Sequence, residues 1–121
     1  MSRRLSISVF AMPSDTNSQN SVFGGWLLSH MDLAGLVECK MFKPGRYVTV
    51  AIDQMKFVKP VAVGDLVQIF TSVEKVGKSS LTIKCVAECN RLDGTEPFQV
   101  TEALMTFVKV DEKGTKVLLT Q

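Results

Sequence analysis

The positions of hydrophobic and polar residues predict one long helix, because Phe23–Lys40 keeps apolar residues on every side of a helical wheel. Its polar residues fall among apolar ones on the helical wheel, as Glu38 does between Leu27 and Met31. A helix that is apolar all round is buried in protein or spans a membrane. This stretch is too short and too interrupted for a span, which needs about 20 apolar residues. We therefore expect a central helix wrapped by the rest of the chain.

Alternation of apolar and polar residues predicts strands before and after this helix. The predicted strands cover residues 4–11, 46–58, 67–76, 79–92 and 98–110. In the second of them, Val48, Val50 and Ile52 have the same parity and are expected to share one face. The apolar parity changes near Asp53 and Gln54, which predicts a bulge or strong coiling there.

Turn-forming residues separate the predicted elements. Lys43-Pro44-Gly45 ends the helix, and Gly77-Lys78 and Asp93-Gly94 are typical of hairpin turns. The resulting order is one strand, one helix and then four strands in a meander. This order predicts the α+β class, with a curved antiparallel sheet of about five strands rolled around the helix.

Length and composition place the chain among single-domain globular proteins. Its 121 residues are expected to form one domain over residues 1–121, and a hydrophobic content of 45% excludes a disordered chain. The net charge of +2 is too small to indicate nucleic-acid binding. Three cysteines, without CxxC spacing, indicate neither a disulfide framework nor a zinc site. We expect a cytoplasmic protein with no signal peptide and no membrane span.

Candidate chemistry gathers on the helix and just before it. Asp32 would be a buried carboxylate, which is costly unless it is paired, hydrogen-bonded or used in a reaction. Gly24-Gly25 opens the helix, either for flexibility or close packing of the helix start, or to let a ligand reach the first free amides. The polar run 14–21 before it is either a solvated connection or part of a site. For His30, the only histidine, we favour a structural role.

Four motifs, in order, carry a resemblance to a known family. They are AMPSDTNSQNSVFGGWLLSHMDLAGL, VTVAIDQMKFVKPVAVGD, VGKSS and VTEALMTFVKVD. Over roughly residues 5–115 the chain resembles the YciA-type acyl-CoA thioesterases of the hotdog-fold superfamily. The resemblance implies a helix held in a curved antiparallel sheet, which agrees with the elements predicted above. It also implies hydrolysis of acyl-CoA to a free acid and CoA without a metal or redox cofactor, by dimers that commonly assemble into hexamers.

The resemblance assigns roles to particular residues. Asp32 matches the family's helix carboxylate, taken as nucleophile or general base, and Asn17 matches a loop asparagine that faces the reacting centre. Gly24 and Gly25 match glycines whose amides polarise the thioester carbonyl. The segment lining the pantetheine and phosphates of CoA is matched by Gly77, Lys78, Ser79 and Ser80. No metal ligands are implied.

Two positions depart from the family pattern. Asn20 stands where the family usually has glycine, and Ser21 where it has Asp or Asn. Asparagine tolerates a left-handed backbone better than most residues, so the loop shape can survive the first change. The second change affects local hydrogen bonding.

Further residues are candidates that the resemblance does not rank. Thr49 lies on the long strand at a position that could face the site. Lys56, Lys59 and Arg91 are candidates for phosphate contacts. The acyl chain is expected in an apolar slot, with Leu28, Met31 and Met55 among its lining residues.

The spacing of the helix residues predicts a site shared by two chains. Asp32 follows Gly25 by seven residues, which is about 10 Å along a helix. That distance is too long for both residues to touch one reacting carbon. We therefore expect a homodimer at least, with two sites at its interface, and a hexamer from the resemblance.

Two other functions remain open at this stage. A non-catalytic acyl-CoA binding module is the first, and the presence of both Asp32 and Asn17 argues against it. A dehydratase or isomerase acting on acyl thioesters is the second, and it would require His30 to line the cleft beside a carboxylate.

Overall fold

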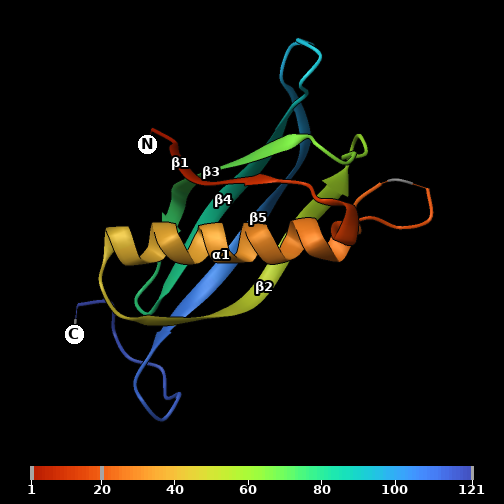
Figure 1. Ribbon diagram of the computed structural model, residues 1–121. Helices are drawn as coiled ribbons and strands as arrows, with labels where there is room; N and C mark the ends of the chain where they lie inside the picture. The colour runs from red at the N-terminus through yellow and green to blue at the C-terminus, as the bar shows by residue number, and fades with distance from the viewer. Residues whose placement is uncertain (1, 20, 121) are drawn as a thin grey trace.

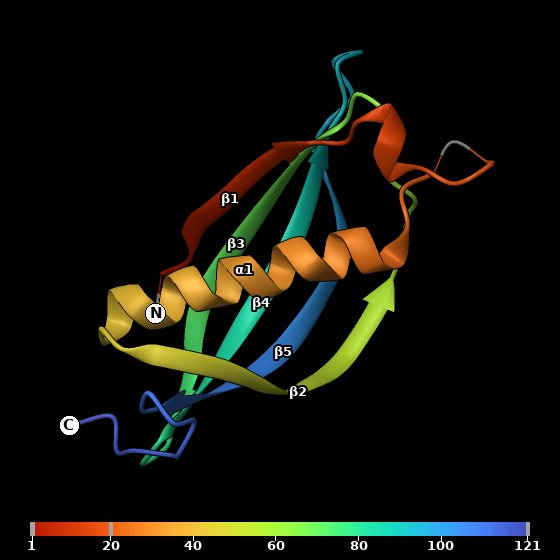
Figure 2. The ribbon, with the colours of Figure 1, turned by 60° about the horizontal axis from the view of Figure 1, so that its bottom comes forward.

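The fold is one helix lying across a five-stranded antiparallel sheet. The computed structural model describes residues 2–19 and 21–120. In chain order the elements are β1 (Arg4–Phe10), the 3₁₀ turn η1 (Pro13–Asp15), α1 (Gly24–Phe42), β2 (Arg46–Phe57), β3 (Leu66–Val76), β4 (Ser80–Asn90) and β5 (Phe98–Val110). Figures 1 and 2 show the sheet curving behind α1, with β1 and β2 at its two edges. The predicted α+β arrangement is confirmed.

The strand order differs from the predicted meander in one respect. β3, β4 and β5 do form consecutive antiparallel neighbours, but β2 pairs with β5 and not with β3. The reason is that β1 occupies the edge of β3 that β2 would need, with Ile7 opposite Ile69. The sheet order is therefore β1-β3-β4-β5-β2, and β2 is left as an edge strand.

The core lies between α1 and the inner face of the sheet. Alternate residues of β3 and β4 are buried, and α1 contacts all five strands. From the helix, Leu27, Met31 and Ala34 are at most 1% exposed. Burying such side chains contributes roughly 1.5–3 kcal/mol for each large one, and this fixes the side of α1 that faces the sheet.

Gly35 brings the middle of α1 close to β5. A Cβ atom at this position would lie 2.5 Å from Cζ of Phe107, a fully buried ring. Non-bonded carbon atoms in a folded protein do not approach each other that closely. The glycine therefore sets the separation between helix and sheet.

Replacing Gly35 by alanine is expected to destabilise the fold by about 1–2 kcal/mol, because overpacking outweighs the better helix propensity of alanine. Denaturant unfolding at one protein concentration measures the change. Gly25→Ala is the matched control on the same helix, since a Cβ there meets no atom within 4 Å. Equal stability of the two variants would contradict the packing role of Gly35.

β2 contains two irregularities. The bulge predicted near Asp53 and Gln54 is confirmed by a register shift between Asp53 and Lys56, where Gln54 has φ of 57°. A second shift between Thr49 and Ala51 was not predicted. Because of it, the prediction that Val48, Val50 and Ile52 share one face is wrong. Val48 pairs with Val108 of β5, and Ile52 pairs with Met105 of β5. Val108 and Met105 are three residues apart in a regular strand, so they lie on opposite faces of the sheet. Their partners Val48 and Ile52 therefore lie on opposite faces as well.

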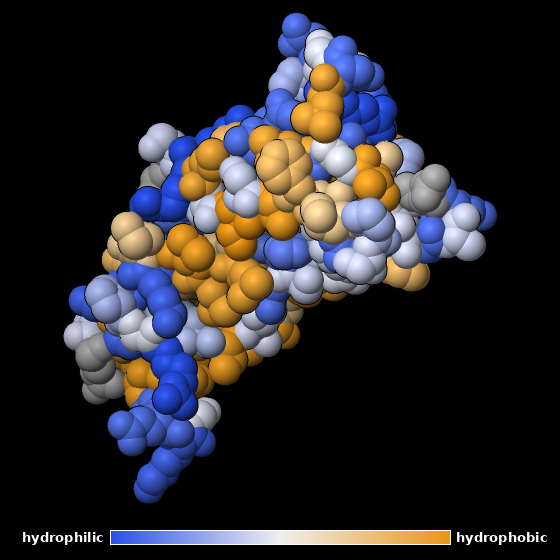
Figure 3. All heavy atoms as spheres, viewed as in Figure 1, coloured by the Kyte–Doolittle hydropathy of each residue, from blue (hydrophilic) through white to orange (hydrophobic). Residues whose placement is uncertain are grey.

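The helix is not wrapped on all sides, contrary to expectation. Leu33, Val37 and Met41 are 53%, 37% and 61% exposed on the side of α1 that faces away from the sheet. Figure 3 shows hydrophobic side chains gathered across this face. The chain wraps one side of the helix and leaves an apolar stripe on the other. No helix among residues 2–19 and 21–120 is both long and apolar enough to cross a membrane.

Candidate functional site

Asp32 is held by a neighbouring strand. Its half-buried side chain points from α1 toward β2, where the Thr49 hydroxyl donates a 2.5 Å hydrogen bond to Asp32 Oδ1. No other hydrogen bond to this carboxylate occurs in the described part of the chain, so Oδ2 is available to a ligand. Thr49, which the sequence offered only as a candidate, thus orients the carboxylate. A carboxylate that is held through one oxygen can use the other oxygen to accept a proton or to attack a carbon.

The start of α1 provides free backbone donors. The first carbonyl to accept helical hydrogen bonds is that of Phe23, which receives the N–H groups of Trp26 and Leu27. The N–H groups of Gly24 and Gly25 precede this ladder and have no helical acceptor. They lie at the positive end of the helix dipole, where a carbonyl oxygen or oxyanion is stabilised.

The two glycines differ in what surrounds them. A Cβ on Gly24 would lie 3.2 Å from Cζ of Phe57, so this glycine allows the Phe57 ring to pack against the helix. Gly25 has open space around it, since a Cβ there would meet nothing within 4 Å. The sequence left close packing and ligand access as alternatives for the pair. The structure assigns packing to Gly24 and is compatible with access at Gly25.

Asn17 uses its side-chain oxygen within its own loop. Asn17 Oδ1 accepts hydrogen bonds from the backbone N–H groups of Gln19 at 2.8 Å and Ser21 at 3.3 Å. The Asn17 N–H donates to the Ser21 carbonyl at 2.8 Å. The amide Nδ2 is therefore the part of Asn17 that remains for a ligand, and it can only donate. Ser21 supplies these bonds through its backbone, so its side-chain departure from the family leaves them in place. Asn20 lies outside the described residues.

The predicted CoA segment lies at the opposite end of α1. Gly77, Lys78, Ser79 and Ser80 form the turn between β3 and β4 and the start of β4, and this turn lies beside the last helical residue, Phe42. The helix from Gly25 to its C-cap at residue 43 spans about 27 Å. One chain therefore does not bring this segment to the two glycines.

An apolar pocket of about 330 Å³ adjoins the start of the helix. Its lining residues are Val22, Phe23, Gly24, Leu27, Phe57, Val58, Lys59, Pro60, Val61 and Val100. None of Leu28, Met31 and Met55, the residues expected to line an acyl slot, is among them. Met31 is fully buried between α1 and the sheet, and Leu28 and Met55 pack against the core. Sequence periodicity missed the pocket because β2 ends next to the helix start, a contact between distant segments.

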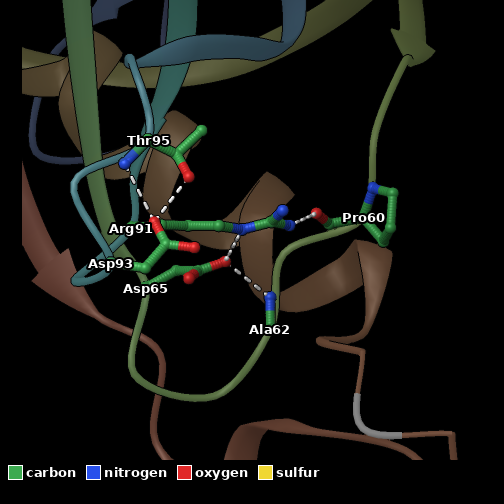
Figure 4. A network of polar contacts seen from close by, with 6 residues as sticks. All are labelled: Pro60, Ala62, Asp65, Arg91, Asp93 and Thr95. Carbon is green, nitrogen blue, oxygen red and sulfur yellow. Dashed lines mark hydrogen bonds and ion pairs between the residues drawn. The ribbon is translucent and has the colours of Figure 1, made fainter.

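A polar network holds one wall of this pocket. Arg91 donates from Nε to Asp65 Oδ2 at 3.4 Å and from Nη2 to the Pro60 carbonyl at 3.3 Å (Figure 4). The Ala62 N–H donates to the same Asp65 oxygen at 2.9 Å. Val61 lies between the two fixed backbone positions and is 2% exposed. The network thus fixes the backbone that presents Val61 to the pocket.

The remaining lysine and arginine candidates are spread over two places. Lys59 and Arg91 both lie over the Phe98 ring, each about 4.8 Å from its centroid, and Lys59 also lines the pocket beside Gly24. Lys56 lines a different hollow, together with Lys84 and Glu102. Arg91 is occupied by Asp65 and Pro60 and is therefore poorly placed to bind a phosphate.

Histidine and cysteine contribute no obvious catalytic group. The His30 ring packs edge-on against Trp26 with centroids 4.6 Å apart. Two residues correspond to about 200° around a helix, so His30 and Asp32 leave α1 in different directions. Burial raises the pKa of the Cys39, Cys85 and Cys89 thiols to about 12, which makes them poor nucleophiles. No cluster of three metal-ligating side chains occurs within the described ranges.

Comparison with known proteins shows the family to which this chain belongs. The sequence profile of the Thioesterase superfamily matches residues 19–92. The acyl-CoA thioester hydrolase YciA of Salmonella typhimurium is 40% identical over 114 residues, which are 91% of this chain and 85% of that protein. The chain belongs to this superfamily and, within it, to the YciA-type acyl-CoA thioester hydrolases.

Solved structures agree with this assignment and with the predicted hotdog fold. A hexameric broad-specificity acyl-coenzyme A thioesterase, in a variant with one aspartate replaced by alanine, has a TM-score of 0.91 at 39% identity, over 96% of this chain and 86% of that one. A hexameric hotdog-fold thioesterase of Campylobacter jejuni has a TM-score of 0.89 at 36% identity, over 94% and 88% of the two chains.

Proposed function

We propose that this protein hydrolyses acyl-CoA thioesters to a carboxylic acid and CoA, at sites shared by two copies of the chain. The observation that carries the proposal is the carboxylate of Asp32, which Thr49 fixes through one oxygen while the other is free. Membership of the YciA-type family supports acyl-CoA as the substrate class. No metal or redox cofactor takes part in the proposed reaction.

Asp32 supplies the step that breaks the thioester, and two routes fit its geometry. As a general base, Oδ2 takes a proton from water while the water oxygen attacks the carbonyl carbon. As a nucleophile, Oδ2 attacks that carbon itself and forms a mixed anhydride, which water then hydrolyses. In both routes the C–S bond breaks and the sulfur leaves as CoA thiolate, which takes up a proton.

The helix start supplies the electrophilic half of the site. The carbonyl oxygen accepts a hydrogen bond from the Gly25 N–H, beside which no side chain stands in the way. Asn17 donates from Nδ2 to the same oxygen or to the attacking water. The acyl group extends into the apolar pocket beside Gly24, where Leu27, Val61 and Val100 form buried walls.

These two halves come from different chains in the proposed site. Asp32 and Gly25 of one helix are about 10 Å apart along its axis. On a lone chain, the stripe formed by Leu33, Val37 and Met41 is a large exposed apolar area. In the proposed dimer, a second copy of the chain covers this stripe. The unpaired edge of β2 adds backbone groups that a second β2 can satisfy. The hexameric relatives support assembly of three such dimers.

A panel of acyl-CoA esters assayed for release of free thiol tests the proposed function. We expect steady-state turnover with at least one ester. Tight binding of these esters without thiol release would replace the hydrolase by a binding module. Hydration or isomerisation of the acyl group without thiol release would point to the dehydratase alternative.

Lys78→Ala is expected to raise KM for acyl-CoA severalfold while kcat changes less than twofold. A phosphate contact far from the reacting carbon stabilises the ground and transition states equally. Steady-state kinetics at low salt, where a charge contact is least screened, measures the effect. An unchanged KM would leave Lys78 as a solvated turn residue.

A further inference from the structure

The apolar pocket beside the start of α1 has a buried floor and an open mouth. Leu27, Val61 and Val100 are at most 2% exposed and close its inner end, whereas Phe23 and Phe57 are each 54% exposed and border its opening. Its volume of about 330 Å³ corresponds to roughly eleven groups the size of a water molecule, at about 30 Å³ each. A methylene group is close to this size, so an acyl chain of at most about ten carbon atoms fits.

One of the three floor residues lies outside the regular elements. Leu27 belongs to α1 and Val100 to β5, where helical and ladder hydrogen bonds hold the backbone. Val61 belongs to the connection between β2 and β3. A wall in a connecting segment yields to a longer chain unless its backbone is fixed, because such segments are more mobile than helices and strands. The contacts that fix Val61 therefore decide how long a chain the pocket accepts.

Hydrogen bonds on both sides of Val61 fix its backbone. On one side, Arg91 Nη2 donates to the Pro60 carbonyl at 3.3 Å. On the other, the Ala62 N–H donates to Asp65 Oδ2 at 2.9 Å. The ion pair from Arg91 Nε to the same Asp65 oxygen, at 3.4 Å, joins the two bonds into one brace across the turn (Figure 4). The Asp65 side chain is only 7% exposed, so salt screens this pair less than it would a surface pair.

We propose that Arg91 and Asp65 are positioning residues that set the upper limit of acyl-chain length, by holding Val61 as a fixed floor of the pocket. The substrates are then short and medium acyl-CoA esters. The inference rests on the proposed function, which places the thioester at the helix start and the acyl group in this pocket. A pair with a merely structural role affects all esters alike. A fixed floor acts only against chains that are long enough to reach it.

The ratio of kcat/KM for hexanoyl-CoA to that for dodecanoyl-CoA measures this limit, at concentrations where both esters are monomeric. We expect a ratio of at least about ten in the parent, because even one methylene too many costs a close-fitting pocket about tenfold or more. Val61→Ala and Arg91→Ala should each lower the ratio at least about fivefold, the first by removing part of the floor and the second by releasing it.

Two further variants separate the floor from a general loss of stability. Val67→Ala removes the same two carbon atoms from a fully buried valine of β3 that does not line the pocket, and it should lower stability while leaving the ratio unchanged. Arg91→Lys keeps a positive charge beside Asp65 but lacks the fork that reaches two acceptors. It should therefore lower the ratio by less than Arg91→Ala, and it serves as the test if Arg91→Ala does not fold.

Direct binding distinguishes failure of this inference from failure of the proposed function. Calorimetric titration with S-alkyl-CoA thioethers, which cannot be hydrolysed, should show affinity rising about threefold to fourfold per methylene from butyl to octyl. The affinity should fall for dodecyl in the parent but not in Val61→Ala. A parent kcat/KM ratio near one, or a ratio that stays the same in the Val61 and Arg91 variants, would overturn the length limit and leave hydrolysis standing. The same affinity profile without thiol release from any ester would keep the floor and overturn the hydrolase.

Discussion

Replacing Asp32 by asparagine is expected to lower kcat by at least about a hundredfold, with KM changed only slightly. The amide is nearly the same size and can still accept the Thr49 hydrogen bond, so the fold and the substrate position are retained. It can neither take a proton from water nor attack the thioester. Steady-state thiol release under saturating acyl-CoA measures kcat, and the melting temperature reports whether the fold is intact.

Glu38→Gln is the matched control for this variant. Glu38 is the other carboxylate on α1; it is buried and accepts hydrogen bonds from Thr71 at 3.0 Å and Arg4 at 3.3 Å. Its neutralisation is expected to lower stability while kcat stays near the parent value. Retention of kcat within a few-fold in Asp32→Asn would make Asp32 a structural carboxylate and overturn the mechanism. An equal loss in both variants would point to a general defect of the helix.

Local patterns in the sequence predicted the elements of the fold well. The predicted helix and the five predicted strands have bounds within two residues of those observed. The apolar character of the helix, the alternation along the strands and turn pairs such as Asp93-Gly94 each involve residues that are close in the sequence. Such local patterns can be recognised from the sequence alone. At that turn, Gly94 takes a positive φ of 84°, which favours glycine.

Errors arose where the structure depends on contacts between distant segments. The pairing of β2 with β5 follows from which edge β1 occupies, and no local pattern records that choice. The bulge after Thr49 inverts the facing of Val48 relative to Ile52. The apolar pattern of α1 was correctly recognised, but the sequence did not separate residues buried in one chain from those, such as Leu33, that are exposed on it.

The candidate site shows the same division. Helical periodicity singled out Asp32, because a carboxylate in an apolar helix is conspicuous. The hydrogen bond from Thr49 joins residues 17 apart, and the packing of Phe57 on Gly24 joins residues still further apart. The β3–β4 turn at Gly77 and Lys78 likewise lies beside Phe42, which is distant from it in the sequence. Such features follow from the folded arrangement and were not accessible to residue patterns.

Mixing two inactive variants, Asn17→Ala and Asp32→Asn, is expected to restore activity. Each variant alone should be nearly inactive, because every site of its homodimer lacks one required side chain. If Asn17 and Asp32 of one site belong to different chains, a mixed dimer has one site with both residues replaced and one site that is intact. Restored thiol release after subunit exchange therefore reports a site shared between chains.

The amount of activity that returns is fixed by statistics. Exchange at equal concentrations makes about half of the dimers mixed, and each mixed dimer has one intact site of its two. About a quarter of the parent activity should return. Mass spectrometry of intact assemblies, with one variant isotopically labelled, measures the extent of exchange. A mixture of Asp32→Asn with Asp32→Asn,Asn17→Ala is the control and should stay inactive, since no combination contains Asp32.

The geometry of one chain gives a reason to expect this result. Asn17 and Gly25 lie at the start of α1, whereas Asp32 lies at its middle, about 10 Å further along the axis. One chain therefore does not bring all three residues to one reacting carbon. If exchange is complete and no activity returns, Asn17 and Asp32 act from the same chain. The partner then covers the apolar stripe without completing the site.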